Sequence, residues 1–215
     1  NTDVVAGKPR LCTDIWTGRY PVVQPGMSVS GFTTLCLAGS FGPVVVDDTD
    51  GWYGILTAWH VVSSGTTADA YAIHPGSANG GSGPYDSIGT VARSIINGFG
   101  DAALIRLSRL PAGAPLGAHY IFRSVKNAEI GDSLMKSGRQ TELTTGEVTG
   151  IGSQSFDYSA WGLGSISITC LEIQPDGLDS AEEIVKSGDS GSAWWIPTTE
   201  ELCGMTLGHV AGDPF

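Results

Sequence analysis

The feature that most constrains the fold is a series of short apolar runs, rich in β-branched and aromatic residues and separated by glycine, proline, asparagine and aspartate. Runs of this kind are typical of antiparallel strands joined by turns. The chain has 31 glycines among 215 residues and no long segment with a helical period. These observations predict an all-β sandwich or barrel, built as one large β domain or two small ones.

A second feature is the segment SGDSGSAWW at residues 187–195, which places Ser190 in a turn between Gly188 and Gly191. Glycine permits backbone angles that residues with a Cβ resist. Such a turn can hold a serine hydroxyl forward and direct backbone N–H groups at the point where an acyl-transfer oxyanion forms. The same sequence is also compatible with a plain hairpin turn, so the functional interpretation requires a base and an orienting acid elsewhere.

Both groups occur upstream of the serine. His60 lies at the end of the apolar, β-prone run 55–62, and Asp101 opens the run 101–107, where its carboxylate can face inward. Asp86 is a rival acid, but its Gly/Ser/Pro-rich surroundings favour a role in a turn. Taken alone, His60 is equally compatible with a core histidine, and Asp101 with a strand-end cap. The order His, Asp, Ser, with gaps of 41 and 89 residues, favours a catalytic triad.

The segments TAWH (57–60), DAAL (101–104) and GDSGS (188–192) together resemble the motifs of the trypsin/chymotrypsin-like serine proteases, closest to bacterial-type and glutamyl-endopeptidase-like members. Residues 134–148 are similar to the strand pair that opens the second barrel in bacterial members. The resemblance covers roughly residues 28–212. It implies two antiparallel six-stranded-type β-barrels with an active site between them.

The resemblance also implies the role of each site residue. Ser190 is the expected nucleophile, His60 the base that passes its proton to the leaving amine, and Asp101 the group that orients the imidazole. The N–H groups of Gly188 and Ser190 are expected to form the oxyanion hole. The implied reaction is hydrolysis of a polypeptide substrate through an acyl-enzyme, with no metal and no organic cofactor.

Three alternatives to this enzyme stay open. One is a catalytically inactive homologue that serves as a binding or scaffold protein. Another is a protein whose main event is self-cleavage, with Phe215 as the product end. An esterase of the α/β-hydrolase type requires Gly-x-Ser-x-Gly and the order Ser, acid, His. The chain has Ser192 in place of the second glycine and the opposite order.

The residues expected to set specificity follow from the same resemblance. Ile184 occupies the position at the base of the primary pocket of trypsin-like members, which argues against cutting after Arg or Lys unless a shifted loop brings in a preceding glutamate. Thr206, Leu207 and Gly208 match the family's Ser-Trp-Gly segment, which pairs with the substrate backbone. In another alignment the segment around His209 resembles the Ile-His-Trp-Gly-Gly segment of glutamyl endopeptidases, whose histidine binds an acidic side chain. A preference for Glu or Gln, or for small or apolar residues, therefore stays open.

The resemblance divides the chain into an N-terminal extension, an N-terminal barrel, a linker and a C-terminal barrel, at residues 1–27, 28–108, 109–120 and 121–215. Strands are expected around residues 31–32 and 36–37, and at residues 88–96 and 101–107. Because the chain ends 25 residues after Ser190, we expect the second barrel to lack its last strand, or to be completed by a further chain or segment. Residues 4–7 resemble the family's Ile-Val-Gly-Gly start, whose amino group pairs with the aspartate before the nucleophile. Three residues precede them, so we do not expect that activation mechanism.

Charge and cysteine content bound the partners and the compartment. The net charge is −11 and most of the acidic excess follows residue 120, which argues against a nucleic-acid partner. No 18-residue apolar run predicts a membrane helix, and no signal peptide is visible. The even number of cysteines fits a secreted protein or another oxidising compartment. We expect the pairs Cys12–Cys36 and Cys170–Cys203, with four free thiols as the alternative.

Overall fold

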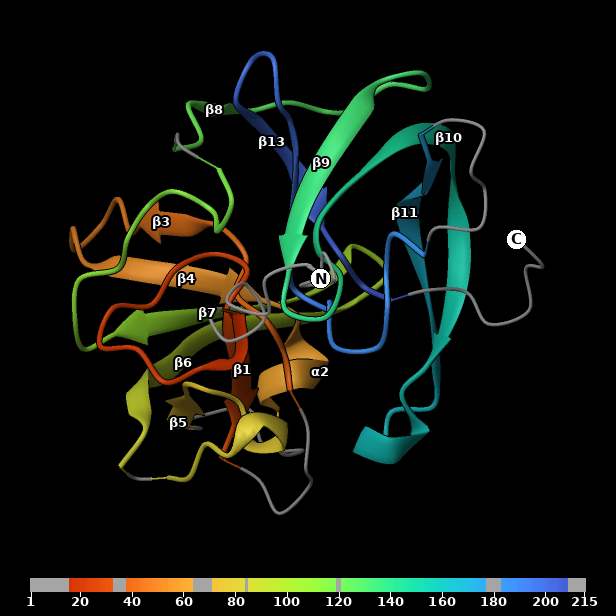
Figure 1. Cartoon of the computed structure of the whole chain (residues 1–215). Coiled ribbons are helices and arrows are strands. Elements are labelled where there is room, and N and C mark those ends of the chain that lie inside the picture. Colours follow the sequence, from red (N-terminus) through yellow and green to blue (C-terminus); the bar gives the residue numbers. More distant parts are fainter. Residues whose placement is uncertain are drawn as a thin grey trace, which may run out of the picture.

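The computed structural model describes residues 16–32, 38–63, 71–83, 85–118, 121–176 and 183–208. Regular structure in these ranges is mostly β and forms two curled sheets (Figure 1). Helical segments are short: α2 (Trp59–Val62), η1 (Ser77–Asn79) and η2 (Ser159–Trp161). No helix in the described ranges is long and apolar enough to cross a membrane. The two-barrel, all-β prediction is confirmed.

The first sheet has the strand order β2-β1-β5-β6-β7-β4-β3, and neighbouring strands are antiparallel. The strands expected at 88–96 and 101–107 are confirmed, whereas the one expected around 36–37 lies outside the described residues. The strands are β1 (Ser28–Gly31), β2 (Gly39–Ser40), β3 (Val44–Val46), β4 (Tyr53–Thr57), β5 (Tyr71–Ile73), β6 (Ser87–Asn97) and β7 (Gly100–Leu107).

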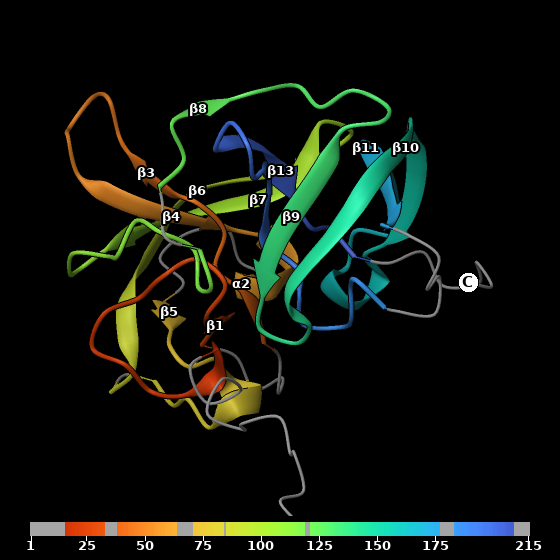
Figure 2. The same cartoon turned by 45° about the horizontal axis from the view of Figure 1, so that its top comes forward.

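The second sheet has the strand order β11-β10-β9-β12-β13-β8. Its neighbours are antiparallel except for β13 and β8, which pair in parallel. Within the described residues β11 and β8 are edge strands, so this sheet is curled but open (Figure 2). The strands are β8 (Ser124–Val125), β9 (Ser133–Gly138), β10 (Glu142–Asp157), β11 (Ser165–Pro175), β12 (Ala193–Ile196) and β13 (Glu201–Met205).

Strands β10 and β11 form the longest two-stranded ribbon in the described residues, and the turn between them packs against the first barrel. The ribbon is paired from Gly146–Pro175 to Asp157–Ser165, and η2 forms the turn. This turn, drawn in teal, lies beside α2 in both views (Figures 1 and 2). Tyr158 at the turn and Ile168 of β11 belong to the same hydrophobic cluster as the core of the first sheet. The second sheet has its own, smaller cluster around Leu134.

Candidate active site

His60 and Asp101 are held together by the pairing of β4 with β7. Thr57 lies opposite Ala103, so the chain that leaves β4 and turns into α2 passes directly by the start of β7. His60 was expected at the end of a strand, but it lies in the single turn of α2, because Ala58 ends the strand and the chain then coils. Its Nδ1 lies 2.5 Å from Asp101 Oδ2, and its backbone N–H donates to Oδ1 at 3.2 Å.

The environment of Asp101 keeps its carboxyl group ionised. The residue is 2% exposed, and this burial by itself acts to raise its pKa. Hydrogen bonds from His60 and from Tyr158 outweigh burial, so the pKa of Asp101 lies below its ordinary value. Since an ionised carboxylate can only accept, the hydrogen between the two side chains is on Nδ1 of His60. The other ring nitrogen, Nε2, is then the one that can accept a proton.

The third group at this pair is Tyr158, which the sequence analysis did not single out. Its hydroxyl donates to Asp101 Oδ2 at 2.7 Å. The ring packs against Trp59, with centroids 6.3 Å apart, and against Trp161, at 6.0 Å. Burial, and then the neighbouring carboxylate, raises the pKa of Tyr158 well above its ordinary value, so the phenol stays a donor.

The turn that carries Ser190 has the backbone conformation that its glycines suggested. Gly188 has φ +108° and Gly191 has φ +90°. A Cβ on Gly191 would stand 2.4 Å from Thr57 Oγ1 and 2.8 Å from the backbone N of Ala58, so the turn packs against the chain that leads into α2. Among the described residues, the N–H groups of Gly188 and Ser190 have no hydrogen-bond partner. Both are therefore available to a ligand.

The hydroxyl of Ser190 is engaged by a backbone carbonyl in this structure. Its hydroxyl donates to the backbone carbonyl of Leu207 at 3.1 Å, and no hydrogen bond joins it to His60 within the described part of the chain. The structure thus brings His60 and Asp101 into contact and places the Ser190 turn beside them. Hydrogen bonds of catalytic groups are often unformed when no substrate is bound.

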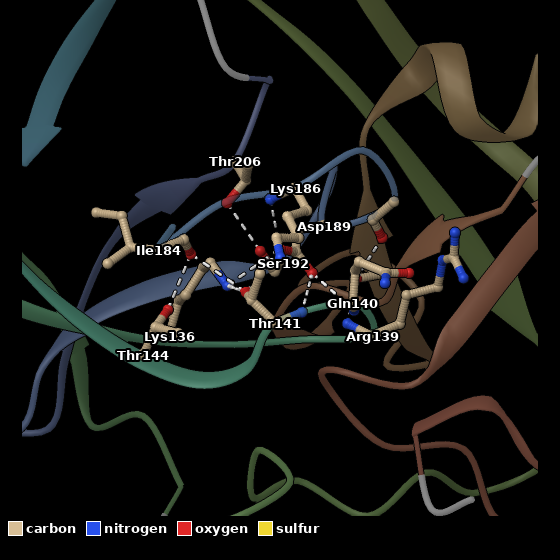
Figure 3. Close-up of polar contacts among 12 residues, drawn as sticks. Lys136, Arg139, Gln140, Thr141, Thr144, Ile184, Lys186, Asp189, Ser192 and Thr206 are labelled. Atoms are coloured by element: carbon tan, nitrogen blue, oxygen red, sulfur yellow. Dashed lines mark hydrogen bonds and ion pairs between the residues drawn. The ribbon is translucent and has the colours of Figure 1, made fainter. Parts of the chain in front are cut away.

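Asp189, which precedes Ser190, is fixed by a buried network that includes a lysine (Figure 3). Asp189 Oδ1 accepts from the backbone N–H groups of Gln140 and Thr141 at 2.8 and 3.2 Å. Its Oδ2 accepts from the Thr141 hydroxyl at 2.7 Å and from the backbone N–H of Lys186 at 2.9 Å. Lys136 Nζ lies 3.4 Å from Oδ2, and neither side chain is exposed.

Lys136 therefore supplies the buried positive charge at this position from within β9. Burial lowers its pKa, and the charge of Asp189 offsets part of that effect. The sequence analysis missed Lys136, although a signal was present. It lies two residues from Leu134 and two from Gly138, and all three are buried in β9. A charged residue at such a position requires a partner. Residues 4–7, considered above for this role, lie outside the described residues.

A second cation, Arg139, lies against Gly188, one of the two residues whose N–H groups are expected to form the oxyanion hole. The Arg139 guanidinium packs on Gly188, where an added Cβ would stand 2.3 Å from a terminal nitrogen. Arg139 Nε donates to the Ala38 carbonyl at 3.2 Å and another nitrogen to Asn79 at 3.2 Å. Residues of the first barrel thus hold the arginine in place. Within the described ranges, no group of three or more His, Cys, Asp or Glu residues is arranged to hold a metal ion.

Four of the residues expected to set specificity line one cavity of about 970 Å³. These are Ile184, Thr206, Leu207 and Gly208, and the cavity extends from Asp101 to β11. The Thr206 hydroxyl lies 2.7 Å from that of Ser192 and accepts from the Trp194 indole at 3.0 Å, so it is engaged inside the barrel. The remaining residue, His209, lies outside the described residues.

Asp86 has the turn role that its surroundings favoured. It accepts from the backbone N–H of Ser82 at 2.8 Å and forms an ion pair with Arg19 at 2.6 Å. Burial acts to raise its pKa, but these donors bring the pKa below its ordinary value. Asp86 therefore belongs to a loop of the first barrel, and the acid that contacts His60 is Asp101.

The expected disulfide between Cys170 and Cys203 is wrong. Both cysteines are free, because Cys170 lies in β11 and Cys203 in β13, and the sheet order places three strands between them. Both side chains line the large cavity, and burial raises the pKa of each thiol. Cys12 and Cys36 lie outside the described residues.

No protein-family model matches the chain, and no curated protein matches it significantly. Among solved structures, it is similar to Thermobifida fusca protease A, with 21% identity, a TM-score of 0.59, and coverage of 87% of this chain and 83% of that one. A Nocardiopsis protease matches at 20% identity and TM-score 0.60, over 86% and 84% of the two chains. A glutamic-acid-specific serine protease, described as using a histidine triad in substrate binding, matches at 21% identity and TM-score 0.52, over 83% and 95%. The chain therefore has the fold of the chymotrypsin-like serine proteases.

Proposed function

We propose that the chain is a serine endopeptidase that hydrolyses peptide bonds through an acyl-enzyme. The observation that carries the proposal is the His60–Asp101 hydrogen bond of 2.5 Å, in which the carboxylate is buried and the imidazole is partly exposed. Beside it lies a Gly-Asp-Ser-Gly turn in which the N–H groups of Gly188 and Ser190 are unpaired among the described residues. A base, an orienting acid, a serine and two unpaired backbone donors are the set that acyl transfer requires.

The proposed mechanism uses these groups in sequence. The Ser190 hydroxyl leaves the Leu207 carbonyl, gives its proton to His60 Nε2 and attacks the scissile carbonyl. The oxyanion is stabilised by the N–H groups of Gly188 and Ser190. His60 then protonates the leaving amine, and a water molecule, deprotonated by the same imidazole, hydrolyses the acyl-enzyme. Asp101 stabilises the imidazolium in both steps.

The cavity is lined by Leu207, whose backbone carbonyl accepts from the Ser190 hydroxyl, and its lining supports a preference for small or apolar residues before the cut. Ile184 and Leu207 are apolar, and the acidic side chains of Glu172 and Glu183 also line the cavity, which disfavours an anionic group there. A preference for Glu or Gln through His209 is the alternative, and it is motivated by the similar fold of a glutamic-acid-specific protease.

The test is cleavage of a peptide library by the wild type and by Ser190→Ala, sorted by the residue before each cut. Ser190→Ala is expected to lower turnover by about 10⁶-fold, and Asp101→Asn by about 10⁴-fold, because the wrong tautomer is presented. Cuts after Glu or Gln that His209→Ala redirects would assign the pocket to His209. A folded wild type that makes no Ser190-dependent cut would refute the proposal and favour a binding or scaffold protein.

Self-cleavage is addressed by the intact mass of the precursor in wild type and in Ser190→Ala. A further chain or segment that completes the second barrel stays a prediction. It would pair at β11, an edge strand within the described residues. The predicted oxidising compartment now rests on Cys12 and Cys36, since Cys170 and Cys203 are free.

A further inference from the structure

The tip of the β10–β11 ribbon brings a tyrosine to the acid of the proposed triad from the other barrel. Tyr158 directly follows β10 and precedes η2, and the turn that it begins lies beside α2 (Figure 1). The ribbon behind it is paired over more than ten residues on each strand. Tyr158 is 4% exposed and is part of the hydrophobic cluster of the first barrel. Its position is therefore fixed by both barrels.

Two donors converge on a single oxygen of Asp101. Oδ2 accepts from the Tyr158 hydroxyl at 2.7 Å and from His60 Nδ1 at 2.5 Å, while Oδ1 accepts from the His60 backbone N–H. His60 on α2 and Tyr158 after β10 are the titratable groups that act on this carboxylate. The imidazole also meets the ring of Trp161, edge-on at 5.7 Å.

The hydroxyl constrains the carboxylate in two ways. It fixes the plane of the carboxylate, which in turn fixes the ring orientation and tautomer of His60. It also draws charge from the oxygen that faces the imidazole, because two hydrogen bonds share the same acceptor. A neutral phenol achieves both without placing a second positive charge beside His60.

We propose that Tyr158 is a positioning residue for the triad, acting through Asp101 and making the second barrel contribute to proton transfer. This inference rests on the proposed protease function. In the described part of the chain, the hydrogen bond of the Tyr158 hydroxyl goes to Asp101, so its effect passes through the carboxylate and the histidine.

The test compares Tyr158→Phe with Tyr158→Leu and with Tyr85→Phe, a matched control at a side chain that is 91% exposed. The Phe variant keeps the ring contacts and loses only the hydroxyl. We expect kcat to fall about tenfold, the effect of one hydrogen bond to a charged group, with little change in KM. The low-pH limb of kcat/KM should move to higher pH, because the freed oxygen stabilises the imidazolium more strongly. Tyr85→Phe should match the wild type.

A purely structural role for Tyr158 predicts a different pattern. Tyr158→Phe would then retain the wild-type kcat and pH profile, and only Tyr158→Leu, which removes the ring, would lose activity together with stability. That outcome overturns the inference while leaving the protease function intact.

A readout that needs no activity separates the two proposals. In the Ser190→Ala background, the proton between His60 Nδ1 and Asp101 is followed by NMR, where a stronger hydrogen bond moves the resonance downfield. We expect a downfield shift in Tyr158→Phe and none in Tyr85→Phe. If the wild type proves inactive, the protease function fails and this signal alone decides the inference. An unchanged resonance in Tyr158→Phe would overturn it.

Discussion

Replacing Lys136 by methionine removes the buried charge that faces Asp189, and the structure sets the size of the effect. Lys136 Nζ lies 3.4 Å from Asp189 Oδ2, with both side chains unexposed. At an effective dielectric constant of about 20, two unit charges at this distance attract by about 5 kcal/mol. Removing one partner of a buried pair typically costs about 3–5 kcal/mol, because the remaining charge is left uncompensated. We expect Lys136→Met to lower the free energy of unfolding by an amount in this range.

The loss should not exceed this range because Asp189 retains other partners. The backbone N–H groups of Gln140, Thr141 and Lys186 still donate to its carboxylate. The positive charge of Arg139 also acts within reach of Asp189. Asp189 fixes the turn before Ser190, so the proposed peptide hydrolysis should fall by more than the loss of folded protein explains.

The assay is urea unfolding followed by circular dichroism, in a Ser190→Ala background that prevents self-digestion. The matched control is Lys136→Met combined with Asp189→Asn, in which no buried charge is stranded. The cost of Lys136→Met should be much smaller on the Asp189→Asn background, giving a coupling free energy of about 3 kcal/mol. Effects of the two substitutions that add within about 0.5 kcal/mol would refute the reasoning.

Three further outcomes are expected. Alkylation without reduction, followed by peptide mapping, should recover Cys170 and Cys203 as separate thiols that react slowly, since burial raises the pKa of both; a cross-linked peptide would contradict this. Burial acts to raise the pKa of Asp86, but hydrogen bonds and the charge of Arg19 bring this pKa below its ordinary value in the folded protein. The ionised carboxylate therefore stabilises the fold fully above about pH 4, the pKa of an aspartate in the unfolded chain. This contribution is lost as the pH falls through the folded pKa. Asp86→Asn should therefore flatten the decline in unfolding free energy below about pH 4. An unchanged slope would contradict the stabilising role of the ionised Asp86. At Gly191, φ is +90° and an added Cβ would stand 2.4 Å from the nearest atom, whereas at Gly51 φ is +69° and a Cβ would meet open space. Gly191→Ala should therefore lower the free energy of unfolding several times more than Gly51→Ala, for which we expect a loss of about 1 kcal/mol. Equal losses would contradict the packing of the turn.

Local patterns in the sequence were sufficient for the strands and for the serine turn. The alternating runs before and after Gly98 became β6 and β7, because both strands are covered on one face by the core. Gly188 and Gly191 both have positive φ, which is the conformation that a glycine at a tight turn indicates. These features depend on neighbours in sequence, and the sequence contains them directly.

Contacts between distant strands were not accessible in the same way. The disulfide between Cys170 and Cys203 failed because strand order in a sheet is set by how the whole barrel closes, and no local pattern encodes it. The partner of Tyr158 lies 57 positions away, in the other sheet. The partner role of Lys136 could have been inferred from the sequence, since a charge on the buried face of a strand requires a partner.

The two partners that the sequence analysis missed differ in charge for a physical reason. Among the described residues, the buried carboxylate of Asp189 contacts no group that becomes cationic during the proposed reaction. A fixed cation, Lys136, offsets its charge. Asp101 faces His60, which takes up a proton in each step of the proposed mechanism. A fixed cation there would cancel the attraction that stabilises the imidazolium, whereas the neutral hydroxyl of Tyr158 orients the carboxylate and leaves its negative charge available. The second barrel thus supports both carboxylates beside Ser190. It places the charge of Lys136 at Asp189, which holds the turn, and the neutral hydroxyl dipole of Tyr158 at Asp101, which stabilises the protonated histidine in the proposed mechanism.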